Sequence, residues 1–184
     1  MVHIHYDLSL VVGSILFALL ACLMVVSLEQ LLFRGSQQKL HKVILVTSGL
    51  VLGVAIWCMH FIAIFACQFP ESFSIDLGLT LTSYVIAFVA STFAIWLITR
   101  PTLSFARLIM GAVLMGLGIS GMHYTGMLAL KLPSYHIQYD AMMVVFSIIF
   151  AICGSGLTFW LTFKYKAAIK YKFWLKLCIA FMMA

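Results

Sequence analysis

The stretch LSLVVGSILFALLACLMVVSLEQLL, Leu8–Leu32, decides the fold class of this 184-residue chain. Its first 21 residues carry no charged side chain, and Glu29 is the first to interrupt them. A helix that crosses a hydrocarbon core of about 30 Å needs ~20 predominantly apolar residues. The stretch is therefore long enough to form a membrane-spanning helix.

Four further runs of this kind follow, at 43–66, 77–98, 105–130 and 141–163, and a sixth helix begins near 173. The whole chain is 65% hydrophobic and only 9% charged, whereas soluble domains carry about 25% charged residues. We therefore predict an all-α, polytopic integral membrane helical bundle. The sixth helix has only about a dozen residues before Ala184, too few to span, so we expect the chain to be a fragment.

The Lys and Arg residues that give the net charge of +6 lie mainly in alternate loops, and this distribution does not indicate a nucleic-acid surface. Ten of the eleven basic residues fall in alternate loops or at their edges: Arg34, Lys39, Lys42, Arg100, Arg107, Lys164, Lys166, Lys170, Lys172 and Lys176. Lys131 lies in a loop of the opposite set. Because Lys and Arg in short loops mark the cytoplasmic side, we expect the N-terminus outside, the lipid bilayer as partner and no nucleic acid.

An internal repeat divides the predicted helices into pairs. Asp7, Asp76 and Asp140 each open a span, in YDLSLVVGSI, IDLGLTLTSY and YDAMMVVFSI. We predict one domain over 1–184, with repeat one at about 6–70, repeat two at about 75–133 and a partial repeat three at about 139–184. N-capping explains the three aspartates; the alternative is that one of them orients a histidine N–H.

The second helix of each complete pair carries a related motif, GVAIWCMHFIAI at 53–64 and GLGISGMHYTGM at 116–127. His60 and His123 are 63 residues apart, close to the 64 residues between Asp76 and Asp140. Units of two spans are parallel, so the two histidines should lie at equal depth near the outer face. By alignment of AFMMA at 180–184 with AVLMG at 112–116, a third histidine would fall a few residues past Ala184.

These motifs offer ligands for a soft metal ion. On a helix, His123 and Met127 are four residues apart and share one face. Imidazole and thioether ligands suit copper, especially Cu(I); Cys58 adds a thiol in the first copy, where Ile64 replaces the second methionine. The alternative is that the histidines bond to neighbouring helices and the methionines fill gaps in the packing.

At this point the motifs resemble those of the MHYT membrane-sensor domain of bacterial signalling proteins. The resemblance implies a multi-pass domain of the bacterial cytoplasmic (inner) membrane, which binds copper near the outer face and senses a diatomic gas: oxygen, carbon monoxide or nitric oxide. It also implies a cytoplasmic output domain in cis, commonly one for cyclic di-GMP. The implied copper ligands are Met59, His60, Met122, His123 and Met127. Tyr124 matches the family's aromatic position, where Phe61 stands in the first copy.

The sequence allows three other functions. A metal transporter would need polar residues at several depths, whereas the inner halves of the motif helices read VILV and LIMGAVL. A haem-binding electron carrier could use His60 and His123 as axial ligands, but the nearby outer segments carry no arginine for haem propionates. The third alternative is a structural membrane anchor. The sequence carries no recognisable catalytic constellation, so we do not expect the chain itself to be an enzyme.

Overall fold

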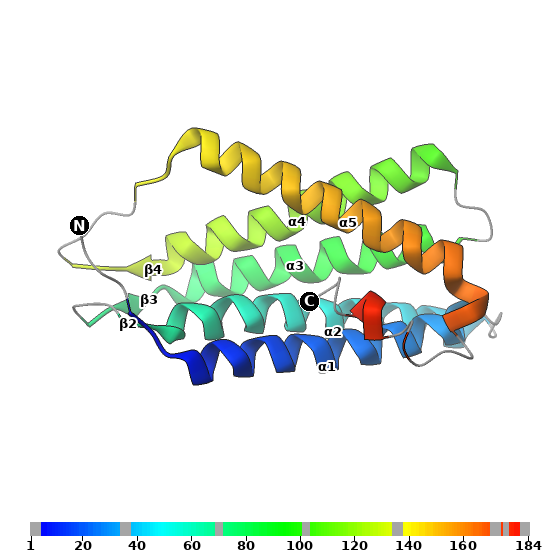
Figure 1. Ribbon diagram of the computed structural model, residues 1–184, viewed down its shortest axis with the longest axis horizontal. Helices are drawn as coiled ribbons and strands as arrows, with labels where there is room; N and C mark the ends of the chain where they lie inside the picture. The colour runs from blue at the N-terminus through cyan, green and yellow to red at the C-terminus, as the bar shows by residue number, and fades with distance from the viewer. Residues whose placement is uncertain are drawn as a thin grey trace.

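The computed structural model describes residues 5–33, 38–68, 72–100, 104–133, 138–169, 174 and 177–180. Within these residues, five helices are long and apolar enough to cross a membrane. They lie side by side along the long axis of the molecule (Figure 1). Their bounds are α1 (Leu8–Phe33), α2 (Gln38–Ala66), α3 (Leu77–Ile98), α4 (Phe105–Ala129) and α5 (Ala141–Ile169). The predicted all-α membrane fold is confirmed.

Two helices extend past their predicted spans. The helix α2 begins at Gln38 rather than near 43, and α5 continues to Ile169 rather than ending near 163. The apolar run sets the part of a helix that crosses the bilayer, whereas the backbone hydrogen bonds continue into the headgroup region. For the sixth helix, residues 174 and 177–180 are helical. The remaining positions of that predicted span lie outside the described residues.

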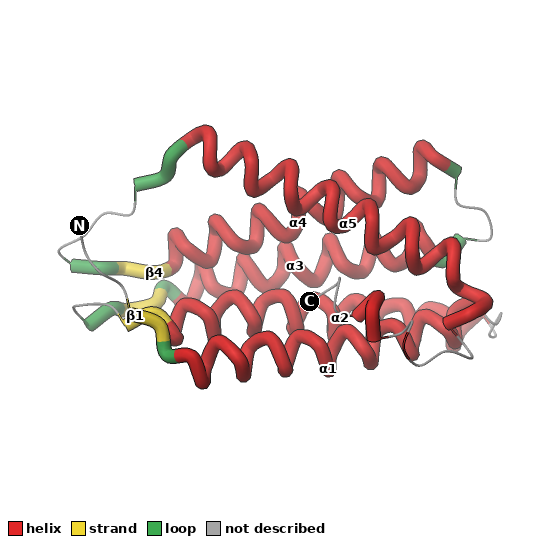
Figure 2. Tube along the Cα trace, viewed as in Figure 1, coloured by secondary structure: helices red, strands yellow, loops and turns green. Residues whose placement is uncertain are grey.

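Two short strand pairs lie together at one end of the bundle (Figure 2). The strand β1 (His5–Tyr6) pairs antiparallel with β2 (Cys67–Gln68), and β3 (Ser74–Ile75) pairs in the same way with β4 (Leu130–Lys131). The helices α2 and α4 carry the Met-His motif and are called the Met-His helices below. Beside each strand pair, the backbone amide of an aspartate donates to the carbonyl of the last residue of a Met-His helix. Asp7 donates to Ala66 at 2.9 Å, and Asp76 donates to Ala129 at 2.8 Å. Residues 5–68 and 74–131 therefore form two closed, parallel units of the same construction.

The three aspartates cap the helices that they precede. The carboxylate of each accepts a backbone N–H two or three residues further on, which satisfies one of the free donors of the first turn. The donors are the amides of Ser9, Leu79 and Met142, at 2.9, 3.2 and 2.8 Å. The predicted capping role is confirmed.

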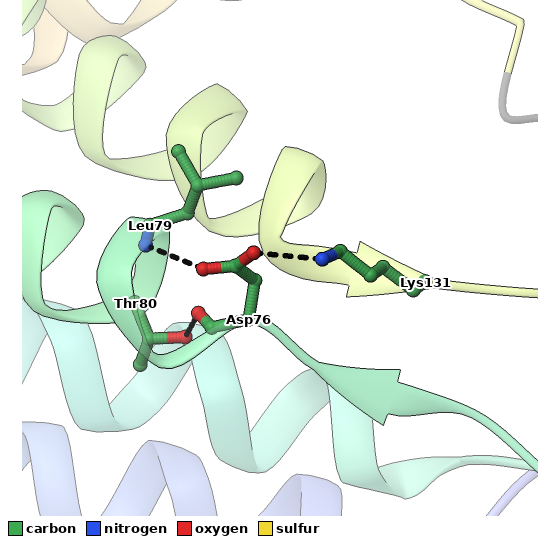
Figure 3. Close-up of polar contacts among 4 residues, drawn as sticks. All are labelled: Asp76, Leu79, Thr80 and Lys131. Carbon is green, nitrogen blue, oxygen red and sulfur yellow. Dashed lines mark hydrogen bonds and ion pairs between the residues drawn. The ribbon is translucent and has the colours of Figure 1, made fainter.

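Asp76 makes a second bond, which joins the two ends of its unit (Figure 3). The Lys131 ammonium donates to Asp76 Oδ2 at 2.7 Å, while Oδ1 accepts from Leu79 and the Asp76 carbonyl accepts from the Thr80 hydroxyl. The bond from Lys131, aided by the Leu79 amide, holds the pKa of this carboxyl below its ordinary value. The pair is exposed to solvent, where such an interaction contributes little to stability.

Glycines let each Met-His helix approach the helix that follows it. A Cβ at Gly53 in α2 would lie 2.8 Å from the Cα of Phe88 in α3, and a Cβ at Gly116 in α4 would lie 2.6 Å from the Cα of Ile152 in α5. Real Cβ atoms do not come so close. Glycine therefore allows close helix packing at these two positions, and α2 and α4 also contact each other.

Candidate functional site

The two motif histidines meet where α2 and α4 approach the end that carries the strands. His60 lies six residues before the end of α2, and His123 lies six residues before the end of α4. Their Nδ1 atoms are 3.2 Å apart, and the imidazole rings are 4.8 Å apart at an angle of 68°. The predicted equal depth of the two histidines is confirmed, and the structure brings them into direct contact.

The environments of the two imidazoles differ. The His60 side chain is 7% exposed, whereas His123 is exposed on the surface of the described chain. Within the described residues, the buried Nε2 of His60 has no hydrogen-bond partner. This atom lies against α4, because a Cβ at Gly126 would be 2.5 Å from it. An incoming ligand would therefore reach the pair through His123, while Gly126 leaves the room that His60 occupies.

The methionines lie in apolar surroundings. Met122 is 2% exposed and belongs to the main core cluster with Leu52 and Ile56 of α2. Met127 packs against a second cluster, formed by Phe61, Ile64 and Leu130. Met59 is half-buried. These positions fit the packing role of methionine, and the ligand role of Met59, Met122 and Met127 stays a prediction.

The donor set of the histidine pair is compatible with a metal ion. Two nitrogen ligands of a tetrahedral ion with bonds of ~2.0 Å lie about 3.3 Å apart, close to the observed separation of 3.2 Å. The same separation also fits a hydrogen bond, provided that one Nδ1 carries the proton. No group of three His, Cys, Asp or Glu side chains in the described part of the chain could hold a metal. Methionine thioethers, which that set of residue types does not include, are the additional ligands that the motifs offer.

Sequence reasoning missed two contacts beside the motif. The Trp57 indole donates to Ser83 Oγ at 3.1 Å, and the Tyr124 hydroxyl lies 2.7 Å from Ser147 Oγ. Both serines lie on the helix that follows a Met-His helix. A signal for them was visible, because each stands seven residues after its capping aspartate in the repeated strings.

Known proteins match this chain through its repeat. The family described as "Bacterial signalling protein N terminal repeat", MHYT, matches residues 53–111 and 116–170. The two matches begin 63 residues apart, which is also the separation of His60 and His123. Each match starts within a Met-His helix, at residues 53 and 116. The family's repeat therefore begins later in the chain than each of the two units that the strand pairs close, 5–68 and 74–131.

Several curated relatives are signalling proteins. The chain is 42% identical over 123 residues to the bifunctional diguanylate cyclase/cyclic di-GMP phosphodiesterase MucR of Pseudomonas aeruginosa, covering 66% of this chain and 18% of the relative. It is 35% identical over 107 residues to the cyclic di-GMP phosphodiesterase NbdA of the same species, covering 58% and 13%. It is 30% identical over 155 residues to the signaling protein YkoW of Bacillus subtilis, covering 84% and 19%.

The chain thus spans less than a fifth of the length of each of these relatives. No solved structure matches it. The family match covers more than half of the chain, and the five described helices suit a multi-pass membrane protein. The chain belongs to the MHYT family and is a membrane sensory input domain of the kind found in bacterial signalling proteins.

Proposed function

We propose that this domain holds a copper ion between its Met-His helices and senses a diatomic gas, O2, CO or NO, at that ion. The proposed ligands are His60 and His123 with sulfur from Met59, Met122 and Met127. Copper would supply the coordination position at which the gas binds. The surrounding side chains orient the imidazoles and bury that of His60.

The single observation that carries this proposal is the contact between His60 and His123 at 3.2 Å. The two imidazoles come from equivalent positions of two repeats, and intramembrane ionisable residues are functional candidates by default. Thioether and imidazole ligands select Cu(I) over harder ions. The exposure of His123 gives a small neutral ligand a route to the pair.

The same geometry disfavours haem. Two axial imidazoles bound to one iron lie about 4 Å apart, on opposite sides of a porphyrin. The Nδ1 atoms of His60 and His123 are already 3.2 Å apart, which leaves no space for a macrocycle between the rings.

The second candidate function is a purely structural membrane anchor. The apolar surroundings of Met122 and Met127 support it, and it predicts that no metal binds.

We further propose that the domain lies in the bacterial cytoplasmic (inner) membrane with its strand pairs outside. The distribution of Lys and Arg supports this orientation, because the loops at the other end of the bundle carry most of the basic residues. The relatives named for cyclic di-GMP enzymes support a cytoplasmic output domain in cis. Gas binding would reach it only if bound and free states differ in helix packing.

The direct test is the copper content of the purified chain in lipid nanodiscs after loading with Cu(I) and removal of excess metal. We expect about one equivalent in the native protein and a loss of most of it in His60→Leu and His123→Leu. His41→Leu is the matched control, because it removes another histidine of α2 at the opposite end of the helix.

Carbon monoxide provides the second step of the test. An infrared band of Cu(I)-bound carbon monoxide is expected in the loaded native protein and in His41→Leu, but not in the two motif variants. Copper binding that survives both motif substitutions would overturn the site. Copper without a carbon monoxide band would retain the metal and remove the support for gas sensing.

A further inference from the structure

A serine recurs at the same place in α1, α3 and α5, the helices that open each repeat and are called the outer helices here. Ser14, Ser83 and Ser147 stand seven residues after Asp7, Asp76 and Asp140. Each hydroxyl donates to the backbone carbonyl three residues earlier in its own helix. The acceptors are Val11, Thr80 and Val144, at 2.8, 2.7 and 2.8 Å. The hydrogen of each serine is therefore used, and its oxygen is left as an acceptor.

In two helices this oxygen receives an aromatic donor from the preceding Met-His helix. The Trp57 Nε1 of α2 donates to Ser83 Oγ of α3 at 3.1 Å and shares its hydrogen with the Thr80 carbonyl at 3.2 Å. The Tyr124 hydroxyl of α4 lies 2.7 Å from Ser147 Oγ of α5. Because Ser147 already donates to Val144, the Tyr124 hydroxyl is the donor of this bond. Both contacts join a helix that bears a histidine to the next outer helix.

The two donors do not occupy equivalent positions in the repeat. Trp57 stands three residues before His60, whereas Tyr124 stands directly after His123. The position of Tyr124 is filled by Phe61 in the first unit, which has no hydroxyl, and the position of Trp57 is filled by Ser120 in the second. Each unit thus retains an aromatic donor to the serine, although the donor comes from a different turn.

Both donors also reach the histidine pair through ring contacts. The Tyr124 ring lies edge-on to the His123 imidazole, with centroids 5.0 Å apart. In the first unit, Phe61 lies between Trp57 and His60, with centroids at 4.9 and 5.1 Å. A bond at the serine fixes the plane of the aromatic ring, and the ring then limits how far the adjacent imidazole can rotate.

We infer that Ser83 and Ser147 are positioning residues, which hold Trp57 and Tyr124 and thereby keep the His60 and His123 imidazoles in contact. Tyr124 in this arrangement is not a metal ligand, because its hydroxyl is committed to α5. The inference deepens the proposed function, since Tyr124 and Ser147 connect the proposed sensing site to α5. The inference concerns protein atoms alone, so its test needs no copper and its failure is distinguishable from a failure of the copper proposal.

The experiment uses the metal-free chain in nanodiscs with 15N in the histidine rings, and assigns the signals of His60 and His123 with His60→Gln and His123→Gln. The native protein should show one protonated, hydrogen-bonded Nδ1 shared by the pair. We expect Tyr124→Phe and Ser147→Ala each to abolish this signal, and the double variant to show no further change. Ser147→Thr, which restores a hydroxyl, should restore it.

Trp57→Phe applies the same test to the first unit and should shift the His60 signals. Tyr165→Phe, at the far end of α5, is the matched control for loss of a tyrosine hydroxyl and should leave both histidines unchanged. Thermal unfolding of every variant separates local loosening from loss of the fold. Native-like histidine signals in folded Tyr124→Phe and Ser147→Ala would overturn the inference, as would a Ser147→Thr variant that behaves like Ser147→Ala.

Discussion

The ammonium of Lys131 lies 2.7 Å from the carboxylate of Asp76 and joins the end of the second two-helix unit to its beginning. In the first unit, Gln68 takes the place of Lys131 in the strand register, and glutamine carries no charge with which to form an ion pair. The strand-end closure is thus common to both units, and the ion pair belongs to the second unit.

The first prediction is a pH dependence of this ion pair. Lys131 lowers the pKa of Asp76 in the folded protein, so the pair stabilises the fold above the ordinary pKa of 3.8 and the gain is lost as the pH falls through the lower, folded value. The unfolding temperature of the native protein in detergent should exceed that of Asp76→Asn at pH 7, and the difference should close below about pH 3.8.

Asparagine retains the helix cap, so this comparison isolates the charge. Lys131→Gln should remove the same pH-dependent part, and the double variant should lose no more than either single variant. A difference between native protein and Asp76→Asn that stays constant from pH 7 to pH 3 would show that it does not come from the ion pair.

The second prediction concerns the close approach of neighbouring helices. Gly53→Ala and Gly116→Ala place a methyl group against the backbone of Phe88 or Ile152, and overpacking of this kind costs about 1–3 kcal/mol. Gly13→Ala is the control, because nothing lies within 4 Å of a Cβ there, and the better helix propensity of alanine should stabilise that variant by up to about 1 kcal/mol. Chemical unfolding in detergent measures all three, and equal effects at all three sites would contradict the packing argument.

The helices, and the starts of all of them except α2, could be predicted from the sequence because both depend on local chemistry. A run of apolar residues gives a span wherever it occurs, and an aspartate before it caps the first turn, as at Asp76. The equal depth of His60 and His123 followed from the repeat spacing alone. These predictions needed the order of residues but no knowledge of which helices are neighbours.

The contacts around the histidines could not be predicted in this way. The bond of Tyr124 to Ser147 and that of Trp57 to Ser83 depend on how far each helix is rotated about its axis, and the apolar faces give no preference because lipid and protein both accept them. The short strands were also missed, since two residues such as His5–Tyr6 carry no periodic pattern. Met122 is a ligand implied by the family resemblance, and the sequence did not show that the rotation of α4 places its side chain in the core.

The third prediction tests the space that Gly126 leaves for His60. A methyl group at Gly126 would lie 2.5 Å from His60 Nε2, so Gly126→Ala should push the imidazole away from His123. We expect destabilisation of about 1–3 kcal/mol and a shift of the His60 ring signals in 15N spectra. Gly154→Ala in α5 is the control, because its Cβ meets nothing within 4 Å. Unchanged His60 signals in Gly126→Ala would show that this close approach does not fix the imidazole.

The fourth prediction separates packing from metal binding at Met122. Met122 and Met115 lie on α4 in the same core cluster, at 2% and 5% exposure, so replacing either by leucine should cost less than about 1.5 kcal/mol. If Met122 supplies a thioether to copper, Met122→Leu should weaken Cu(I) binding by roughly tenfold or more, while Met115→Leu should leave the affinity unchanged. The measurement is competition with a colorimetric Cu(I) chelator on nanodisc samples of matched stability. Equal affinities in the two variants would remove Met122 from the ligand set and leave it as a core residue, with the copper site resting on the two imidazoles and the other sulfur donors.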